Sequence, residues 1–180
     1  EFGEMAKTVK EESRIAKIQE YGEEKLPAGD LSGYEIIVVE GRADVVNLIR
    51  NRVNNVIGMN GTKLPAEIAK LSKDKELTLF VDGDRGGILI AKNVISNAKV
   101  KYVAVAPEGK EVEELMGKKS LMSLRKRVPV EDYLRRFEVR SFRESQGAQG
   151  EEKSRAAEET PAERAAGNAL ESTAEKAEEK

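Results

Sequence analysis

The chain has 180 residues and a mass of 19.9 kDa, which suits one domain with appendages. It contains neither cysteine nor histidine, so disulfides, Cys-bearing zinc sites, cysteine nucleophiles and Ser-His-Asp triads are excluded. The net charge of −2 is unevenly distributed, because residues 144–180 include ten acidic and five basic residues and the first 143 residues carry +3.

The N-terminal residues are predicted to form a helix followed by a break. Residues 1–24 are rich in charge, and their few apolar residues are spaced as on a helix. Residues 26–30 (LPAGD) contain proline and glycine, which favour an interruption before the main domain. We therefore expect a helical or linker segment over residues 1–34. Because the chain begins Glu-Phe-Gly rather than with Met, we also expect it to be a piece of a longer protein.

The central part of the chain alternates short apolar segments with helical patterns. Four strands are predicted at residues 35–39, 55–58, 77–81 and 101–106, where β-branched and other apolar residues form short runs. The intervening segments have apolar residues at i+3 and i+4 spacing, as on helices that cover a core. This alternation predicts an α/β fold with a mostly parallel four-stranded sheet flanked by helices.

Short helices are predicted after the fourth strand, because apolar residues recur at i+3 and i+4 spacing between residues 112 and 137. Residues 35–142 are therefore assigned to the main domain. From Glu144 onward Leu170 is the only large apolar residue, so residues 143–180 are predicted to be a disordered charged tail or linker. No run of 18 apolar residues occurs, so no membrane span is expected, and the lack of cysteine favours the cytoplasm.

Acidic residues directly follow two of the predicted strands. Glu40 comes after the first strand, and Asp82 and Asp84 come after the third. The carboxyl ends of parallel strands meet at one edge of a sheet, and alternate residues point to the same side, so these carboxylates can face one cavity. An all-oxygen ligand set favours Mg²⁺ or Mn²⁺. The structural alternative is a turn in which Asp84 caps the next helix.

Basic residues and glycines are predicted at the same edge. Arg42, Lys63 and Arg85 lie in its loops and are candidates for binding nucleotide or nucleic-acid phosphates, although each also suits a solvated surface. The glycines at 86 and 87 leave the amides of a helix start open to a phosphate. The chain has no P-loop, and the residues after Asp82 do not match a calcium-binding EF-hand loop.

Two segments together resemble the toprim domain. They are residues 38–45 (VVEGRADV) and residues 80–87 (FVDGDRGG). In that family a glutamate follows the first strand and an Asp-x-Asp pair follows a later strand, and the resemblance covers about residues 35–107. The wider sequence from about residue 20 to residue 137, including APEGKEVEEL after the fourth strand, is most similar to the archaeal DnaG-type primases.

The resemblance implies synthesis of RNA primers from nucleoside triphosphates on a single-stranded DNA template, with Mg²⁺ or Mn²⁺ as the cofactor. It implies that Glu40 is a general acid or base and a metal ligand. It also implies that Asp82 and Asp84 bind metal and that Asp44 is a further acidic ligand.

Archaeal members of the family also associate with the RNA exosome, so an RNA or exosome scaffold is the alternative, together with a small toprim nuclease. A topoisomerase would need a strand-cleaving tyrosine from a separate domain. A piece of this length, with few residues outside the resembling segment, is expected to bind metal and still to be a poor primase.

Overall fold

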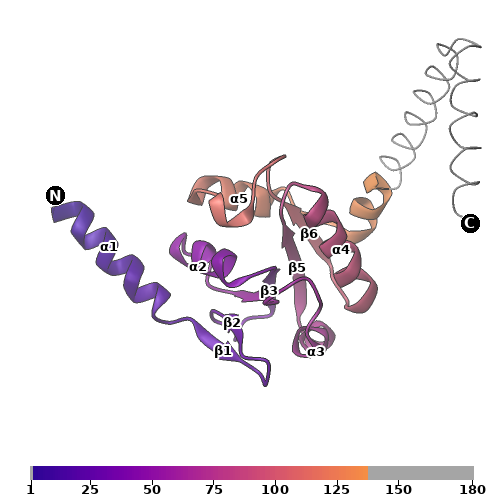
Figure 1. Cartoon of the computed structure of the whole chain (residues 1–180), viewed down its shortest axis with the longest axis horizontal. Coiled ribbons are helices and arrows are strands. Elements are labelled where there is room, and N and C mark those ends of the chain that lie inside the picture. The colour runs from indigo at the N-terminus through magenta and orange to yellow at the C-terminus, as the bar shows by residue number, and fades with distance from the viewer. Residues whose placement is uncertain (1, 138–180) are drawn as a thin grey trace, which may run out of the picture. The chain divides into compact units, whose positions relative to one another are not determined.

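The computed structural model describes residues 2–137 (Figure 1). The predicted tail at 143–180 and the end of the predicted main domain, residues 138–142, lie outside the described residues. The chain up to Tyr133 forms one compact unit.

A seven-stranded sheet in the order β1-β2-β4-β3-β5-β6-β7 forms the centre of this unit. Its four central strands are parallel: β4 (Val56–Gly58), β3 (Glu35–Val39), β5 (Glu76–Val81) and β6 (Tyr102–Val105). Three short antiparallel strands extend its two edges: β1 (Gln19–Tyr21), β2 (Leu26–Ala28) and β7 (Val128–Pro129). The predicted parallel sheet is therefore confirmed, and antiparallel strands widen it.

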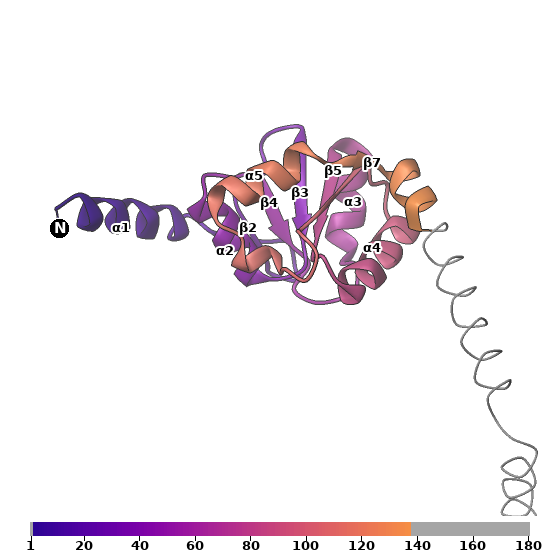
Figure 2. The same cartoon turned by 90° about the horizontal axis from the view of Figure 1, so that it is seen from above.

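Helices cover both faces of the sheet (Figures 1 and 2). One face packs against α2 (Arg42–Arg50) and α5 (Gly117–Arg125). The other packs against α3 (Ala66–Asp74) and α4 (Arg85–Asn97). The first helix, α1 (Phe2–Ile15), has no buried residue and lies beside α2.

The central strand β3 shows why the parallel strands have continuous apolar sequences. Ile36 and Val38 point into the core beneath α3 and α4. Ile37 and Val39 point into the opposite core beneath α2 and α5. Successive side chains of a strand point to opposite faces, so a strand with helices on both sides must be apolar at every position.

The prediction for the N-terminal segment is wrong after Ile15. The residues expected to complete a helix and then break the structure form the hairpin β1–β2, whose strand β2 pairs with β4. Its turn uses left-handed backbone at Gly22 (φ 72°) and Lys25 (φ 52°). Helical spacing of a few apolar residues therefore failed to reveal a short hairpin whose stability comes from tertiary packing.

The helices expected after β6 are partly confirmed. The 3₁₀ helix η1 (Val112–Glu114) and α5 lie in this region, and another helix begins at Val130. Between them, residues 128–129 add the edge strand β7 next to β6. No helix within residues 2–137 has the length and apolar character needed to cross a bilayer.

Replacing Leu26 by alanine tests whether the hairpin belongs to the folded core. Leu26 is 1% exposed and packs in the core beneath α3 and α4. We expect Leu26→Ala to lower the free energy of unfolding by about 2–5 kcal/mol, because it leaves a cavity. Leu89→Ala is the matched control, since Leu89 is 66% exposed, and we expect it to change stability by less than about 0.5 kcal/mol. Urea unfolding followed by circular dichroism measures both, and equal effects would show that the hairpin is not packed.

Candidate active site

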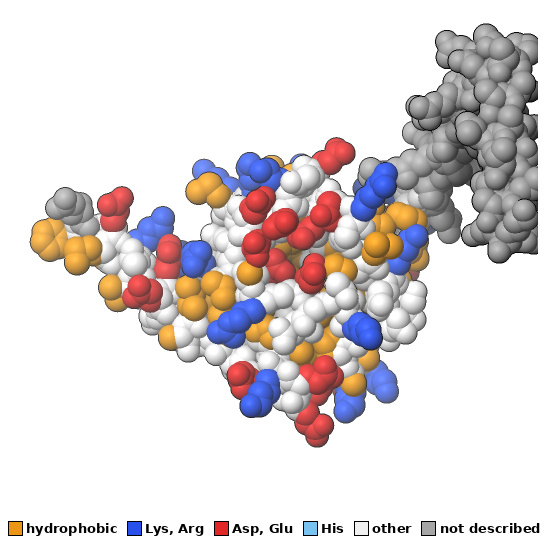
Figure 3. All heavy atoms as spheres, viewed as in Figure 1, with side chains coloured by type: hydrophobic (Ala, Val, Ile, Leu, Met, Phe, Trp, Pro, Cys, Tyr) orange, Lys and Arg blue, Asp and Glu red, His pale blue; other side chains and the backbone are white. Residues whose placement is uncertain are grey.

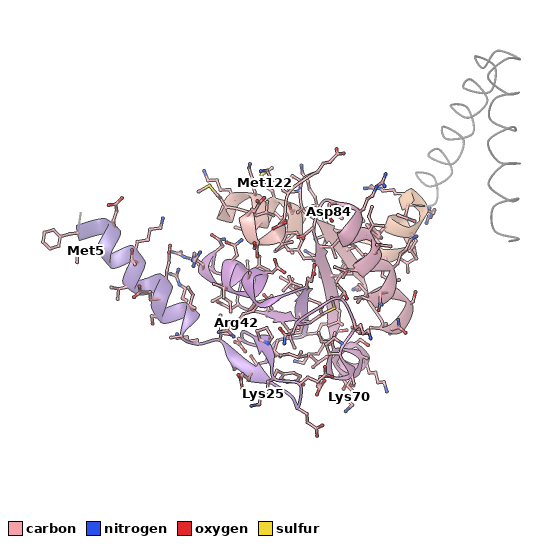
Figure 4. The ribbon with its side chains drawn as sticks, in the orientation of Figure 1. Met5, Lys25, Arg42, Lys70, Asp84 and Met122 are labelled. Atoms are coloured by element: carbon pink, nitrogen blue, oxygen red, sulfur yellow. The ribbon has the colours of Figure 1, made fainter. Side chains whose placement is uncertain are left out.

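Parallel pairing of β3 with β5 brings the predicted acidic residues to one edge of the sheet. The two strands pair in register from Glu35 with Glu76 to Val38 with Leu79. Glu40 directly follows β3 and Asp82 directly follows β5. Red side chains gather in the upper middle of Figure 3, and Figure 4 labels Asp84 among them. We call Glu40, Asp44, Asp82 and Asp84 together the acidic edge.

The carboxylates of the acidic edge repel one another. Burial raises the pKa of Glu40, and the charges of Asp82 and Asp84 raise it further. Burial also raises the pKa of Asp82, as does the charge of Asp84, against a hydrogen bond that lowers it. Proximity of like charges favours the protonated form of each acid, so a bound cation would relieve the repulsion.

Backbone amides hold two of these carboxylates in place. The Val112 N–H donates to Asp82 Oδ1 at 2.7 Å, and the Gly87 N–H donates to Asp84 Oδ1 at 2.8 Å. Asp84 is therefore the N-cap of α4, as the structural alternative predicts. Both hydrogen bonds are accepted by Oδ1, so Asp82 and Asp84 each keep a second carboxylate oxygen, Oδ2, that can bind a ligand.

Asp44 lies behind Glu40 in the first turn of α2. It is only 9% exposed, and its Oδ2 accepts a hydrogen bond from the Gly41 N–H at 2.9 Å. Burial raises the pKa of Asp44 to about 6, and the charges of Asp82 and Glu40 act in the same direction. Asp44 therefore interacts electrostatically with Glu40, which follows β3, and with Asp82, which follows β5.

Three further glutamates that were not predicted as site residues lie beside the acidic edge. Glu111, Glu113 and Glu114 belong to the segment after β6. The charge of Glu113, and to a lesser degree those of Asp82 and Asp84, raises the pKa of Glu111. The sequence contained the signal, since this acidic segment also follows a parallel strand at its carboxyl end.

Asn47 anchors the segment that carries these glutamates. It is buried on α2, and its side-chain amide donates to the backbone oxygens of Val112 at 2.9 Å and Leu115 at 2.8 Å. Val112 in turn donates to Asp82, so one buried amide links α2 to the orientation of a predicted metal ligand. No sequence pattern identifies Asn47, because its partners are 65 and 68 residues away along the chain.

The predicted basic residues are exposed and do not contact the acids. Arg42 and Arg85 are the first residues of α2 and α4, which places them at the same edge, and Lys63 lies in the loop between β4 and α3. Within residues 2–137, no hydrogen bond or salt bridge joins any of the three to a carboxylate. They remain available to an anionic ligand.

The donor set fits a hard divalent cation that is only partly coordinated by protein. Within the described part of the chain, no three acidic side chains converge closely enough to hold an ion by themselves. Mg²⁺ is usually held by one or two carboxylates and completed by water and phosphate oxygens. Asp82 and Asp84 match that pattern, and Glu40 lies near enough for their charges to raise its pKa.

A family model and the named relatives point to the same protein family. A family model described as Toprim domain matches residues 34–106. A protein named DNA primase DnaG from Nanoarchaeum equitans is 48% identical over 139 residues, which are 76% of this chain and 38% of that protein. Its counterpart of the same name from Archaeoglobus fulgidus is 54% identical over 129 residues, 71% of this chain and 32% of that protein. The chain thus spans about a third of the length of these curated relatives.

A solved structure shows the same fold. The crystal structure of a DNA primase domain from Pseudomonas aeruginosa superposes with a TM-score of 0.53 at 21% identity, covering 61% of this chain and 40% of that one.

Adjacent glycines at the start of α4 allow a matched test of the site geometry. A Cβ on Gly87 would collide with the backbone oxygen of Asp82, whereas on Gly86 the nearest atom would be Asp84 Oδ1 at 3.2 Å. We expect Gly87→Ala to lower the free energy of unfolding by about 2 kcal/mol or more, because backbone must move. Gly86→Ala should stay within about 1 kcal/mol of the original protein, since alanine favours the helix. Thermal unfolding compares the two, and similar losses would contradict the close packing of α4 on β5.

The raised pKa of Asp44 predicts a pH-dependent contribution to stability. A carboxyl that holds its proton more tightly in the folded than in the unfolded chain stabilises the fold below about pH 4, and this stabilisation is lost as pH rises through about 6. Asp44→Asn should therefore gain stability relative to the original protein between these values. Urea midpoints in metal-free buffer from pH 4 to 7 measure the difference.

The control for this experiment is Asp30→Asn. A hydrogen bond with Ser32 lowers the pKa of Asp30, so its contribution has the opposite sign and is lost as pH falls. If the urea midpoints of Asp44→Asn and the original chain differed by the same amount at every pH, the raised pKa of Asp44 would be refuted.

Proposed function

We propose that this chain, whose residues 34–106 match a family model described as Toprim domain, is the catalytic core of a DnaG-type primase. Such an enzyme synthesises RNA primers from nucleoside triphosphates on a single-stranded DNA template. The observation that carries the proposal is the identity of about half of the aligned residues to archaeal proteins named DNA primase DnaG. The residues that the Toprim domain model matches, 34–106, include all four acids of the acidic edge.

The chemistry of the acidic edge supports nucleotidyl transfer. We assign Asp82 and Asp84 as the ligands of a divalent cation, Mg²⁺ or Mn²⁺, with Glu40 and Asp44 completing the negative surroundings. The bound cation would neutralise charge on the triphosphate and on the leaving pyrophosphate. Glu40 has a raised pKa and is assigned as the group that takes the proton from the attacking 3′-hydroxyl of the primer.

The exposed basic residues supply the second part of the proposed site. Arg42 and Arg85 begin helices whose positive ends point to the acidic edge, a location that favours phosphate. Together with Lys63 they are assigned to the triphosphate or to backbone phosphates of the template and primer. The segment with Glu111 and Glu113 provides further acidic groups for the same cation or a second one.

No contact within the described residues favours one of the other hypotheses over the primase hypothesis. Association with the RNA exosome, a small nuclease activity and a cytoplasmic location remain predictions of the sequence. Docking on the exosome differs from the primase hypothesis because it does not require the carboxylates of the acidic edge, whereas a toprim nuclease would require them.

Removal of the proposed metal ligands tests the function. In a full-length protein, Asp82→Asn and Asp84→Asn should reduce primer synthesis at least roughly 100-fold, because both remove charge from the cation site. In this chain alone, Mn²⁺ should selectively broaden NMR signals near Glu40, Asp82 and Asp84, and the substitutions should abolish this effect.

Asp74→Asn is the matched control, because Asp74 is an exposed acid at the far end of α3. It should leave both primer synthesis and Mn²⁺ broadening unchanged. Survival of both primer synthesis and Mn²⁺ broadening in Asp82→Asn and Asp84→Asn would exclude the metal assignment. Loss of metal binding without loss of primer synthesis would exclude the proposed mechanism.

A further inference from the structure

A groove between α1 and the end of α2 is a second concentration of charge, opposite in sign to the acidic edge. Its volume is about 400 Å³, and residues of both helices line it. One acid, Glu11, lies in it beside five cations, which define what we call the basic groove: Lys7, Lys10, Arg14, Arg50 and Arg52. Basic side chains are visible where α1 approaches the rest of the unit (Figure 3).

The five cations of the basic groove outnumber its one acid, Glu11. Lys7, Lys10 and Arg14 are spaced at i, i+3 and i+7, so α1 presents all three on one face. None of the five groove cations forms a salt bridge with another residue of the described chain. Like charges that face each other across a groove repel, and an anionic occupant would relieve that repulsion.

Arg52 has a backbone conformation that usually belongs to glycine. Its φ is 67°, at the position where α2 ends with hydrogen bonds from the Arg52 N–H to the Ile49 oxygen and from the Val53 N–H to the Leu48 oxygen. Glycine is the favoured residue at this position of a helix end, because it has no Cβ to oppose left-handed backbone. The left-handed backbone places the exposed Arg52 just after the end of α2, where it lines the basic groove together with Arg50.

The outer face of α2 connects the basic groove with the acidic edge. Arg42 and Arg50 are exposed and eight residues apart, with Val46 between them at i+4 spacing. Eight residues of α-helix span about 12 Å. A strand that passes the acidic edge at Arg42 can therefore continue along α2 to Arg50 and Arg52.

We propose that the basic groove binds the phosphodiester backbone of a single-stranded nucleic acid. No aromatic side chain is among the described residues that line it, so base stacking is not offered and the contacts are independent of base sequence. That the strand is the template rests on the proposed function, since template DNA and an RNA strand present the same phosphates. The five cations and their lack of salt bridges within the described residues point to a backbone-binding groove in either case.

The test measures the binding of labelled single strands to this chain by fluorescence anisotropy, without divalent metal or nucleotide. The probes are a mixed-sequence DNA 20-mer and an RNA of the same sequence. Arg52→Gly removes one cation and also relieves the left-handed backbone. Lys25→Gly is the matched control, because Lys25 is an exposed cation with φ 52° in the β1–β2 turn, away from α1 (Figure 4).

We expect Arg52→Gly to weaken binding roughly fivefold at low salt and to reduce the slope of log affinity against log salt by about 0.7. Its urea midpoint should be equal to or above that of the original chain, so the loss cannot be attributed to unfolding. Lys25→Gly should leave both the affinity and the slope unchanged. The probe that shows the loss, DNA or RNA, identifies the strand.

Equal affinities of Arg52→Gly and Lys25→Gly for both probes would overturn the proposal. Because the measurement needs no catalysis, inactivity of a full-length protein in primer synthesis would not affect it. Conversely, if primer synthesis is lost in variants of the acidic edge and kept in Arg52→Gly, the anisotropy measurement still decides whether the basic groove binds a single strand.

Discussion

Parallel pairing of β3 with β5 is the constraint on which the rest of the structure depends, because it puts two strand ends side by side. Strands that run in the same direction need a crossover, and the helices that provide it here cover both faces of the sheet. The edge where the strands end is left open, and the loops that follow β3 and β5 each begin with an acid. Glu40 and Asp82 therefore meet although 41 residues separate them along the chain.

Holding several carboxylates together opposes folding, and this chain stabilises them with backbone amides. The amides of Gly41, Gly87 and Val112 each donate to one carboxylate of the acidic edge. Neutralisation by lysine or arginine would have consumed the negative charge that a cation needs. The fold thus fixes the positions of the acids and keeps their charge for a ligand.

The two signs of charge are separated along α2. Asp44 lies in the first turn of this helix at the acidic edge, and Arg50 and Arg52 lie at its other end in the basic groove. The net charge of the whole chain is only −2, so it does not reveal that negative and positive charge are separated along α2. A nucleic-acid strand carries negative charge along its whole length, so it is drawn to the groove and repelled from the acids unless cations intervene.

The sequence by itself determined the parallel sheet and three of the acids. Strands such as β3 are buried on both faces and must be apolar throughout, and an acid that directly follows such a strand has only one edge at which to lie. Tertiary structure alone decided the β1–β2 hairpin, the role of Asn47 and the basic groove. Short strands lack enough residues for a periodic signal. Asn47 contacts residues 65 and 68 positions away, and the groove joins Lys7 to Arg52, so these features exist only once distant segments have packed together.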